Sequence, residues 1–168
     1  MTEFKSTPSE IAELASMSME LLSMDHWDVF YADNSELKRA KLEQLEKALE
    51  TLPWVASIDK FQHWIYTTKH TAKERKEKWL EISAKLGNQI IDWEGNENVH
   101  ANLWQRQLHL YEVPFYYIEY GMAQLGAIAM WRSYKKLRED GLDNYMDALK
   151  LGYTKSISEL YETAGIKF

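Results

Sequence analysis

The chain has 168 residues, of which 45% are hydrophobic and 27% charged, and its formal net charge is −6. These values are typical of a globular domain with a core of ordinary size, and the negative charge argues against a nucleic acid or an anionic membrane as partner. There is no cysteine, which excludes disulfides and thiol chemistry. Because the N-terminus is polar and no apolar run is long enough to cross a bilayer, we expect a soluble, cytoplasmic protein.

The first predicted helix begins at Pro8 and ends near Met24. Proline suits the first turn of a helix, Ser6 or Thr7 can cap it, and Glu10 completes a capping box. Its core-facing residues recur at helical spacing: Ile11, Leu14, Ala15, Ser18, Leu21 and Leu22. We therefore expect this helix to pack against the core along one side.

Helical signals continue after an aromatic connector. Asn34 or Ser35 is predicted to cap a charged helix with apolar residues at helical spacing. Pro53 is predicted to open a separate helix that reaches about residue 69, because proline is favoured at a helix start. These two helices should therefore be distinct elements.

The second half of the chain contains its most apolar segment. Thr71 is expected to cap a charged helix that Gly87 ends, and residues 88–102 should form an irregular loop. Segment 114–131 is apolar on all sides, which predicts a buried central helix, and Gly141 should then break the chain. Short amphipathic helices are expected at 142–151 and 156–163. We predict one all-α domain, a helical bundle over residues 1–168.

Three carboxylates lie along one strip of the first predicted helix. The spacing of Glu10, Glu13 and Glu20 makes them face the same way, so they repel one another unless a positive or hydrogen-bonding group meets them. On spacing alone, a solvated acidic face is the favoured interpretation. Small and apolar neighbours weaken it, because carboxylates on a close-packed helix tend to coordinate a cation or orient a histidine.

Histidine and tyrosine gather before and within the apolar segment. Tyr117 and Tyr120 are three residues apart and Tyr116 and Tyr120 four, so their hydroxyls can converge on the opening turns of the predicted helix. His109 shortly precedes them. A helix N-terminus offers free N–H groups and partial positive charge, which can stabilise an oxyanion. For any single tyrosine, an aromatic core cluster is the alternative.

The other histidines show no metal-binding pattern. They are His26, His63, His70 and His100. None stands in an HxxxH or HExxH motif, and there are no cysteines to complete a site, so this sequence contains no complete zinc site. We expect them at the surface or at the edge of the core.

Four long motifs cover most of the chain: TPSEIAELASMSMELL, LPWVASIDKFQHWIY, WQRQLHLYEVPFYYIEYGMAQLGAIAMW and ELYETAGIKF. Together they resemble the C-terminal portion of the oligoendopeptidase F family. That family is similar to the thimet oligopeptidases, zinc metallopeptidases that cleave short peptides inside an all-helical fold. The resemblance implies the C-terminal part of such a catalytic domain.

The resemblance also assigns a metal-binding role to the acidic strip. In that family an HExxH helix supplies two histidine ligands, and a later helix with the pattern E-x-x-S-x-x-x-E supplies the third. Here the pattern reads Glu13, Ser16 and Glu20. By resemblance, Glu13 is the third zinc ligand, and Glu20 lies behind the ligands and hydrogen-bonds a ligating histidine.

A substrate-binding role is implied for the tyrosine-rich stretch. His109, Tyr117 and Tyr120 match family residues that contact the substrate backbone and stabilise the tetrahedral oxyanion, and Tyr116 is a weaker match. These positions agree with the convergence that their spacing predicts.

The chain departs from the family because no HExxH motif precedes Glu13. It is therefore interpreted either as a truncated form of a longer zinc oligoendopeptidase, with short peptides as substrates and the HExxH-containing part as partner, or as a natural remnant. We expect the isolated chain to bind no zinc tightly and to hydrolyse no peptide. The alternative is a non-catalytic helical module that binds peptides or acts as a scaffold. Helices that lack their usual neighbours should expose apolar surface, which a symmetric homo-dimer can cover.

Overall fold

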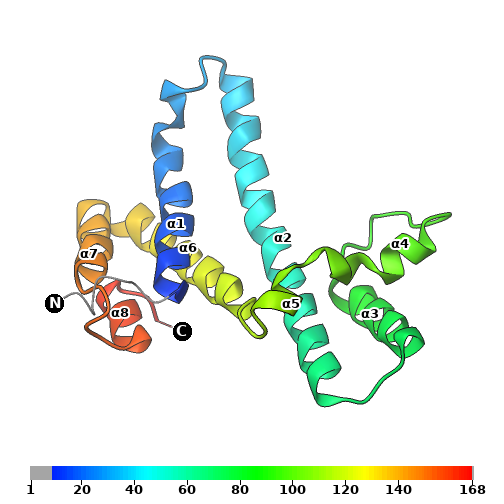
Figure 1. Ribbon diagram of the computed structural model, residues 1–168. Helices are drawn as coiled ribbons and strands as arrows, with labels where there is room; N and C mark the ends of the chain where they lie inside the picture. The colour runs from blue at the N-terminus through cyan, green and yellow to red at the C-terminus, as the bar shows by residue number, and fades with distance from the viewer. Residues whose placement is uncertain (1–8, 168) are drawn as a thin grey trace. The chain divides into compact units, whose positions relative to one another are not determined.

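The computed structural model describes residues 9–167, which form helices joined by turns, with no strand in that range (Figure 1). This confirms the predicted all-α class. The described residues belong to two compact units. The first unit takes its residues from both ends of the chain, up to Ala48 and from Met122 onward, and the second unit comprises Leu49–Gly121.

The first unit is built mainly from five helices. They are α1 (Ser9–Ser23), the 3₁₀ helix η2 (Met24–Val29), most of α6 (Ile118–Leu137), α7 (Glu139–Lys150) and α8 (Ile157–Thr163), joined by the first part of α2 (Asn34–Thr67). Five of the six residues predicted for the core stripe of α1 are buried, and Ala15 is half-buried. Helices α7 and α8 lie side by side (Figure 1). The predicted caps of the first helix lie outside the described residues.

Gly126 on α6 marks a close approach within the first unit. A Cβ atom at this position would lie 2.7 Å from Cδ1 of Leu14 and 2.8 Å from Cε1 of Tyr161. The absence of a side chain therefore lets α1 and α8 pack directly on α6. The hydroxyl of Tyr145 on α7 donates to the main-chain oxygen of Ala15 at 3.0 Å, which ties α7 to α1 as well.

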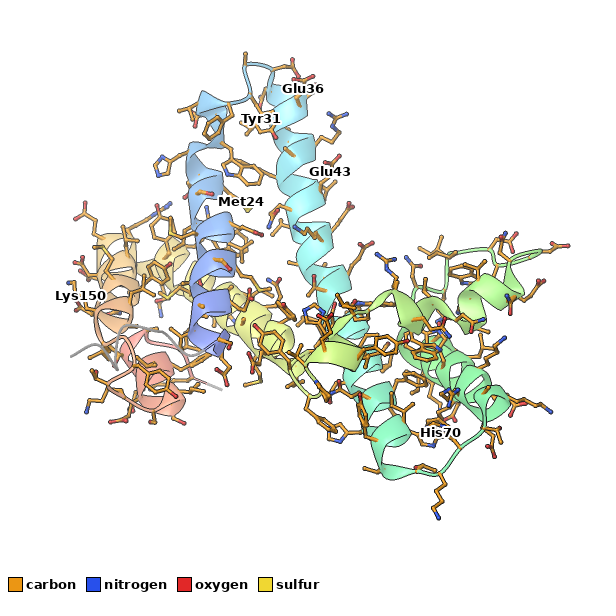
Figure 2. All side chains as sticks on the ribbon, in the orientation of Figure 1. Met24, Tyr31, Glu36, Glu43, His70 and Lys150 are labelled. Carbon is orange, nitrogen blue, oxygen red and sulfur yellow. The ribbon has the colours of Figure 1, made fainter. Side chains whose placement is uncertain are left out.

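An ion cluster connects η2 with the end of α6. The carboxylate of Asp25 accepts hydrogen bonds from Lys135 and from Arg138, the latter at 3.0 Å. The hydrogen bond from Lys135 and the neighbouring Arg138 lower the pKa of Asp25. Met24, which precedes this carboxylate and is labelled in Figure 2, is buried in the core.

The second unit has its own aromatic core. The rest of α2 packs with α3 (Ala72–Leu86), α4 (Glu97–Ala101), the 3₁₀ helix η3 (Leu103–Arg106) and α5 (His109–Glu112). Phe61 is fully buried, with ring centroids 5.4 Å from Trp79 and 5.0 Å from Trp104. The other buried members are Ile58, Ile82 and Leu110. Because hydrophobic contacts surround Phe61 on several helices, this ring is central to the unit.

Some predicted helix boundaries are correct and others are wrong. Thr71 caps α3, as predicted, and the structure adds that it does so in a capping box with Glu74. Asp33, not Asn34 or Ser35, caps α2, since its Oδ1 accepts from the main-chain N–H groups of residues 35 and 36. The predicted loop at 88–102 contains the short helix α4.

Pro53 does not begin a new helix, because α2 runs through it. Proline removes the N–H that would reach the carbonyl of Leu49, and Leu49 is exposed, so water can satisfy that carbonyl. Packing of Val55, Ile58 and Phe61 on the buried side keeps the chain helical beyond the proline.

Gly141 does not break the chain either. It lies buried inside α7, where a Cβ would come within 2.9 Å of the Tyr134 Cα atom. The break falls earlier, at Arg138, whose φ is 53°. Glycine here permits close packing and does not end a helix.

Helix α6 was predicted to be buried on all sides, and this is wrong. Ile118, Met122 and Leu125 recur at helical spacing and are each about two-fifths exposed, at 41, 40 and 43%. Among the described residues no helix is both long and apolar enough to cross a membrane.

Candidate functional site

His109 and three tyrosines meet in the second unit at the junction of α5 and α6. His109 begins α5, Tyr116 and Tyr117 lie in the following turn, and Tyr120 is in the first turn of α6. Tyr116 and Tyr117 were expected on the helix, but it begins only at Ile118. The turn brings the side chains together without all of them sharing a helix.

Ring and hydrogen-bond contacts join this cluster. Nε2 of His109 lies 3.1 Å from the Tyr120 hydroxyl. The Tyr120 ring centroid lies 5.2 Å from that of Tyr117 and 5.5 Å from that of Tyr116, in edge-on arrangements that aromatic rings favour. The His109 ring stacks on Tyr116 at 5.9 Å. The structure therefore brings together all four predicted members of the cluster.

Trp54 and Gln107 belong to the same network, although sequence reasoning did not identify them. The indole Nε1 of Trp54 lies 3.0 Å from the Tyr117 hydroxyl and 3.3 Å from Oε1 of Gln107. The Gln107 Nε2 atom lies 2.8 Å from Nδ1 of His109. Burial raises the pKa of the Tyr117 phenol, while the hydrogen bond from Trp54 and the charge of Arg106 act to lower it. Tyr117 is therefore a neutral hydrogen-bonding group at neutral pH.

The turn that carries the tyrosines is fixed to α2 by aromatic contacts. Phe115 has a φ of 65°, which is uncommon for a residue with a side chain. Its ring centroid lies 5.0 Å from that of His63 and 5.6 Å from that of Tyr66. The Tyr66 hydroxyl also donates to the main-chain oxygen of Leu110. These contacts hold both ends of the segment that positions His109 and the tyrosines.

The predicted metal-binding carboxylates lie on α1 in the first unit. Glu13 is half-buried and Glu20 exposed. The Ser16 hydroxyl donates to the main-chain oxygen of Glu13, and the Glu20 carboxylate accepts from Nε2 of Gln44 at 2.8 Å. Both carboxylates are thus accessible on a helix whose other side is in the core.

These carboxylates do not make a zinc site by themselves. Across residues 9–167, no three histidine, cysteine, aspartate or glutamate side chains are grouped closely enough to hold a metal ion. Structural and catalytic zinc sites in proteins use three or four such ligands. The donor set of the described residues is therefore incomplete for zinc, and Glu13 could contribute only one ligand of a set.

The sequence matches a known family model along almost its entire length. The model for peptidase family M3 matches residues 2–168. A comparison with curated proteins finds no match. The resemblance seen in the sequence motifs is confirmed at the level of the family.

Solved structures of similar fold belong to larger proteins. PZ peptidase A with an inhibitor is 29% identical, with a TM-score of 0.89 over 98% of this chain and 29% of its own. A protein assigned as oligoendopeptidase F is 29% identical at a TM-score of 0.86, over 99% of this chain and 29% of its own. Another so assigned, from Bacillus anthracis, is 26% identical at a TM-score of 0.76, over 98% of this chain and 26% of its own. The chain thus spans less than a third of each.

Proposed function

Because this chain belongs to peptidase family M3, we propose that it forms the C-terminal part of the catalytic domain of a zinc-dependent oligoendopeptidase. That enzyme would hydrolyse internal bonds of short peptides. The hydrogen-bonded cluster of His109, Tyr117 and Tyr120 carries the proposal, because these residues occur in the motif that resembles the family and lie together in the structure. Similarity to an inhibitor-bound peptidase and two proteins assigned as oligoendopeptidase F supports it.

In this proposal the cluster binds the peptide and stabilises charge. Tyr120 and Tyr117 present phenol groups, with His109 and Tyr116 beside them. A hydrogen-bond donor placed where an oxyanion develops contributes more to the transition state than to the bound substrate. Loss of one such donor typically costs about 2.7–4 kcal/mol of barrier. Tyr117 and Tyr120 are the residues to which we assign this role.

Glu13 is proposed as the third zinc ligand, and Glu20 as the group that hydrogen-bonds a ligating histidine. The other two ligands would come from the HExxH-containing part of a longer enzyme. Zinc would supply Lewis acidity to the bound water and carbonyl.

We also propose a cytoplasmic location, since the cysteine-free sequence suits a reducing compartment. In addition, we propose that the chain self-associates through exposed apolar residues such as Met122 and Leu125.

The isolated chain is proposed to hold no zinc tightly and to cleave no peptide. One carboxylate cannot give the affinity of a site with three protein ligands. Isothermal titration with Zn²⁺ should show no stoichiometric tight site. A tight site with a stoichiometry of one would contradict this part of the proposal.

A chimera provides the test of the complete proposal. The segment of PZ peptidase A that matches this chain would be replaced by the chain itself. We expect the purified chimera to retain zinc, measured by mass spectrometry of the metal, and to cleave a quenched fluorescent peptide. Glu13→Gln should remove both properties, because an amide is a much weaker zinc ligand than a carboxylate.

The matched control is Glu10→Gln, one turn earlier on the same strip of α1. It should leave zinc content and cleavage unchanged. Equal zinc content in the Glu13→Gln chimera would disprove the ligand assignment. A folded chimera that holds zinc and binds peptide without cleaving it would instead favour the non-catalytic peptide-binding module.

A further inference from the structure

A continuous chain of hydrogen bonds crosses the second unit from α2 to α6. It starts at the indole Nε1 of Trp54, passes through both ends of the Gln107 amide, then through both nitrogens of the His109 ring, and ends at the Tyr120 hydroxyl. Its three links measure 3.3, 2.8 and 3.1 Å. The links between Trp54 and His109 are partly shielded from water.

The tryptophan end of the chain has a fixed direction. An indole N–H only donates and has no acceptor, so the atom of Gln107 that faces it must be the carbonyl oxygen. If the amide were turned round, its NH₂ group would face the indole N–H and two donors would oppose each other. Trp54 also donates to the Tyr117 hydroxyl at 3.0 Å. Sharing the N–H between two acceptors does not change the fact that a reversed Gln107 amide would bring two donor groups face to face. The Gln107 NH₂ group is therefore directed at His109.

This direction fixes the hydrogen on the histidine ring. Nδ1 of His109 faces the NH₂ donor of Gln107, so Nδ1 must accept and carry no hydrogen. In neutral imidazole the hydrogen then resides on Nε2, which faces the Tyr120 oxygen. We infer that Trp54 and Gln107 are positioning residues that hold His109 as the Nε2–H tautomer, so that His109 donates to the oxygen of Tyr120.

The consequence falls on Tyr120. Because its oxygen accepts from His109, the hydrogen of its own hydroxyl is donated to an acceptor other than His109. With the opposite tautomer, Tyr120 would give that hydrogen to Nε2 and could not present it elsewhere. This step rests on the proposed function, in which the Tyr120 hydroxyl donates to the substrate carbonyl. The tautomer itself is a property of this chain and needs neither metal nor substrate.

Nitrogen NMR of the ¹⁵N-labelled chain measures the tautomer directly. Long-range proton–nitrogen correlations separate a ring nitrogen with a hydrogen from one without. Signals of His109 would be assigned by their loss in His109→Ala. We expect Nδ1 in the unprotonated range and Nε2 in the protonated range. The reverse pattern, or equal averaging of the two nitrogens, would overturn the inference without any variant.

Gln107→Glu should reverse the tautomer of His109. A carboxylate still accepts from Trp54 but cannot donate to His109, so it should draw a hydrogen onto Nδ1. The Nδ1 signal should move from the unprotonated to the protonated range. Gln105→Glu adds the same charge two residues away, where Gln105 contacts Asn102 and is exposed; it should leave the Nδ1 signal in place. An unchanged Nδ1 signal in a folded Gln107→Glu chain would contradict the role of Gln107.

Trp54→Phe tests the first link. Without the indole N–H, the Gln107 amide can take either orientation, and the Nδ1 signal should shift toward an intermediate value. If this variant does not fold, the unmodified chain and Gln107→Glu still decide the question. If the chain has the expected Nε2–H tautomer but the chimera with PZ peptidase A fails to hold zinc or cleave peptide, only the enzyme proposal is rejected. If the chimera is active but His109 has the reverse tautomer, only the positioning role of Trp54 and Gln107 is rejected.

Discussion

The acidic strip of α1 and the tyrosine cluster of the second unit are organised in opposite ways. Glu13 and Glu20 are half-buried and exposed, and Glu20 has a neutral amide, Gln44, beside it. The cluster at His109 instead has partners at both ring nitrogens and aromatic rings on several sides. The proposed function gives a role to residues of each region, yet only the cluster at His109 is completed by contacts within its own unit.

The difference follows from the cost of burial. A carboxylate that remains in contact with water needs no partner in the fold, so it can be held ready for a cation. The phenol, indole and imidazole groups of the cluster are half-buried among aromatic rings, and their polar atoms need hydrogen-bond partners there, since a polar atom shielded from water without a partner costs about 1–3 kcal/mol. The aromatic cluster is therefore coupled to the stability of its unit, whereas the acidic strip should be nearly independent of stability.

The largest effect is expected from Phe61→Ala. Removing the ring that lies between Trp79 and Trp104 should lower the free energy of unfolding by about 3–5 kcal/mol. Hydrogen exchange should show the loss of protection concentrated in residues 49–121, because those residues form one compact unit. Leu21→Ala, at a buried site in the first unit, is the matched control and should lower protection in the other residues. Equal loss throughout the chain in both variants would show that the two units unfold together.

Trp54→Phe should be the next largest. It removes one N–H group shared by two acceptors, Tyr117 and Gln107, and should cost about 1–3 kcal/mol in urea unfolding. Trp27→Phe is the control, because the half-buried Trp27 indole donates to a single acceptor, Ser23, one turn away on the same segment; it should cost under about 1 kcal/mol. Equal losses would mean that ring size, not the hydrogen bonds, determines the effect.

A stabilising change of about 1 kcal/mol is expected for Gln62→Met. Gln62 is fully buried in the second unit, and within residues 9–167 neither atom of its amide has a hydrogen-bond partner. Methionine has a similar volume without the unsatisfied groups. Gln62→Glu, which places a charge at the same position, should be strongly destabilising. A less stable methionine variant in thermal unfolding would indicate that a buried water pairs with the amide.

Sequence alone predicted those elements whose signals are local. The cap at Thr71 depends only on residues within one turn of it, and the helix that follows was predicted correctly. Pro53 and Gly141 were misinterpreted because their roles depend on distant packing: α2 is kept helical by buried residues beyond the proline, and Gly141 accommodates the backbone of α6. Such tertiary contacts override local preference.

The candidate site shows the same limit. Spacing predicted that Tyr117 and Tyr120 converge, and the motif placed His109 with them. Trp54 lies 63 residues before Tyr117 and 53 before Gln107 in sequence, so no spacing rule could connect them. The signal available was chemical: a tryptophan in an amphipathic helix needs a partner for its N–H.

Small effects are expected on the acidic strip. Glu13→Gln and Glu20→Gln should each change the free energy of unfolding of this chain by less than about 0.5 kcal/mol, as for ordinary surface substitutions. In Glu20→Gln the new amide oxygen can still accept from Gln44. Urea unfolding measures both. A loss as large as that of Trp54→Phe would show that the carboxylates stabilise the fold itself, which would remove the contrast between the two regions.

The smallest expected effect concerns the charge beside the cluster. Arg106 lies 5.8 Å from the Trp54 ring and acts to lower the pKa of Tyr117, which burial raises. In Arg106→Gln that attraction is lost, so the pKa of Tyr117 should rise further above its usual value. When the pKa of a group is higher in the folded state than in the unfolded state, the group contributes stability that is fully present at pH values below its unfolded pKa. This contribution is lost as the pH rises through the folded pKa. Ring-carbon NMR of Tyr117 in alkaline titration measures the shift. Lys76→Gln removes a charge elsewhere in the unit and should leave Tyr117 unchanged; equal shifts would mean that net charge, and not the position of Arg106, sets the effect.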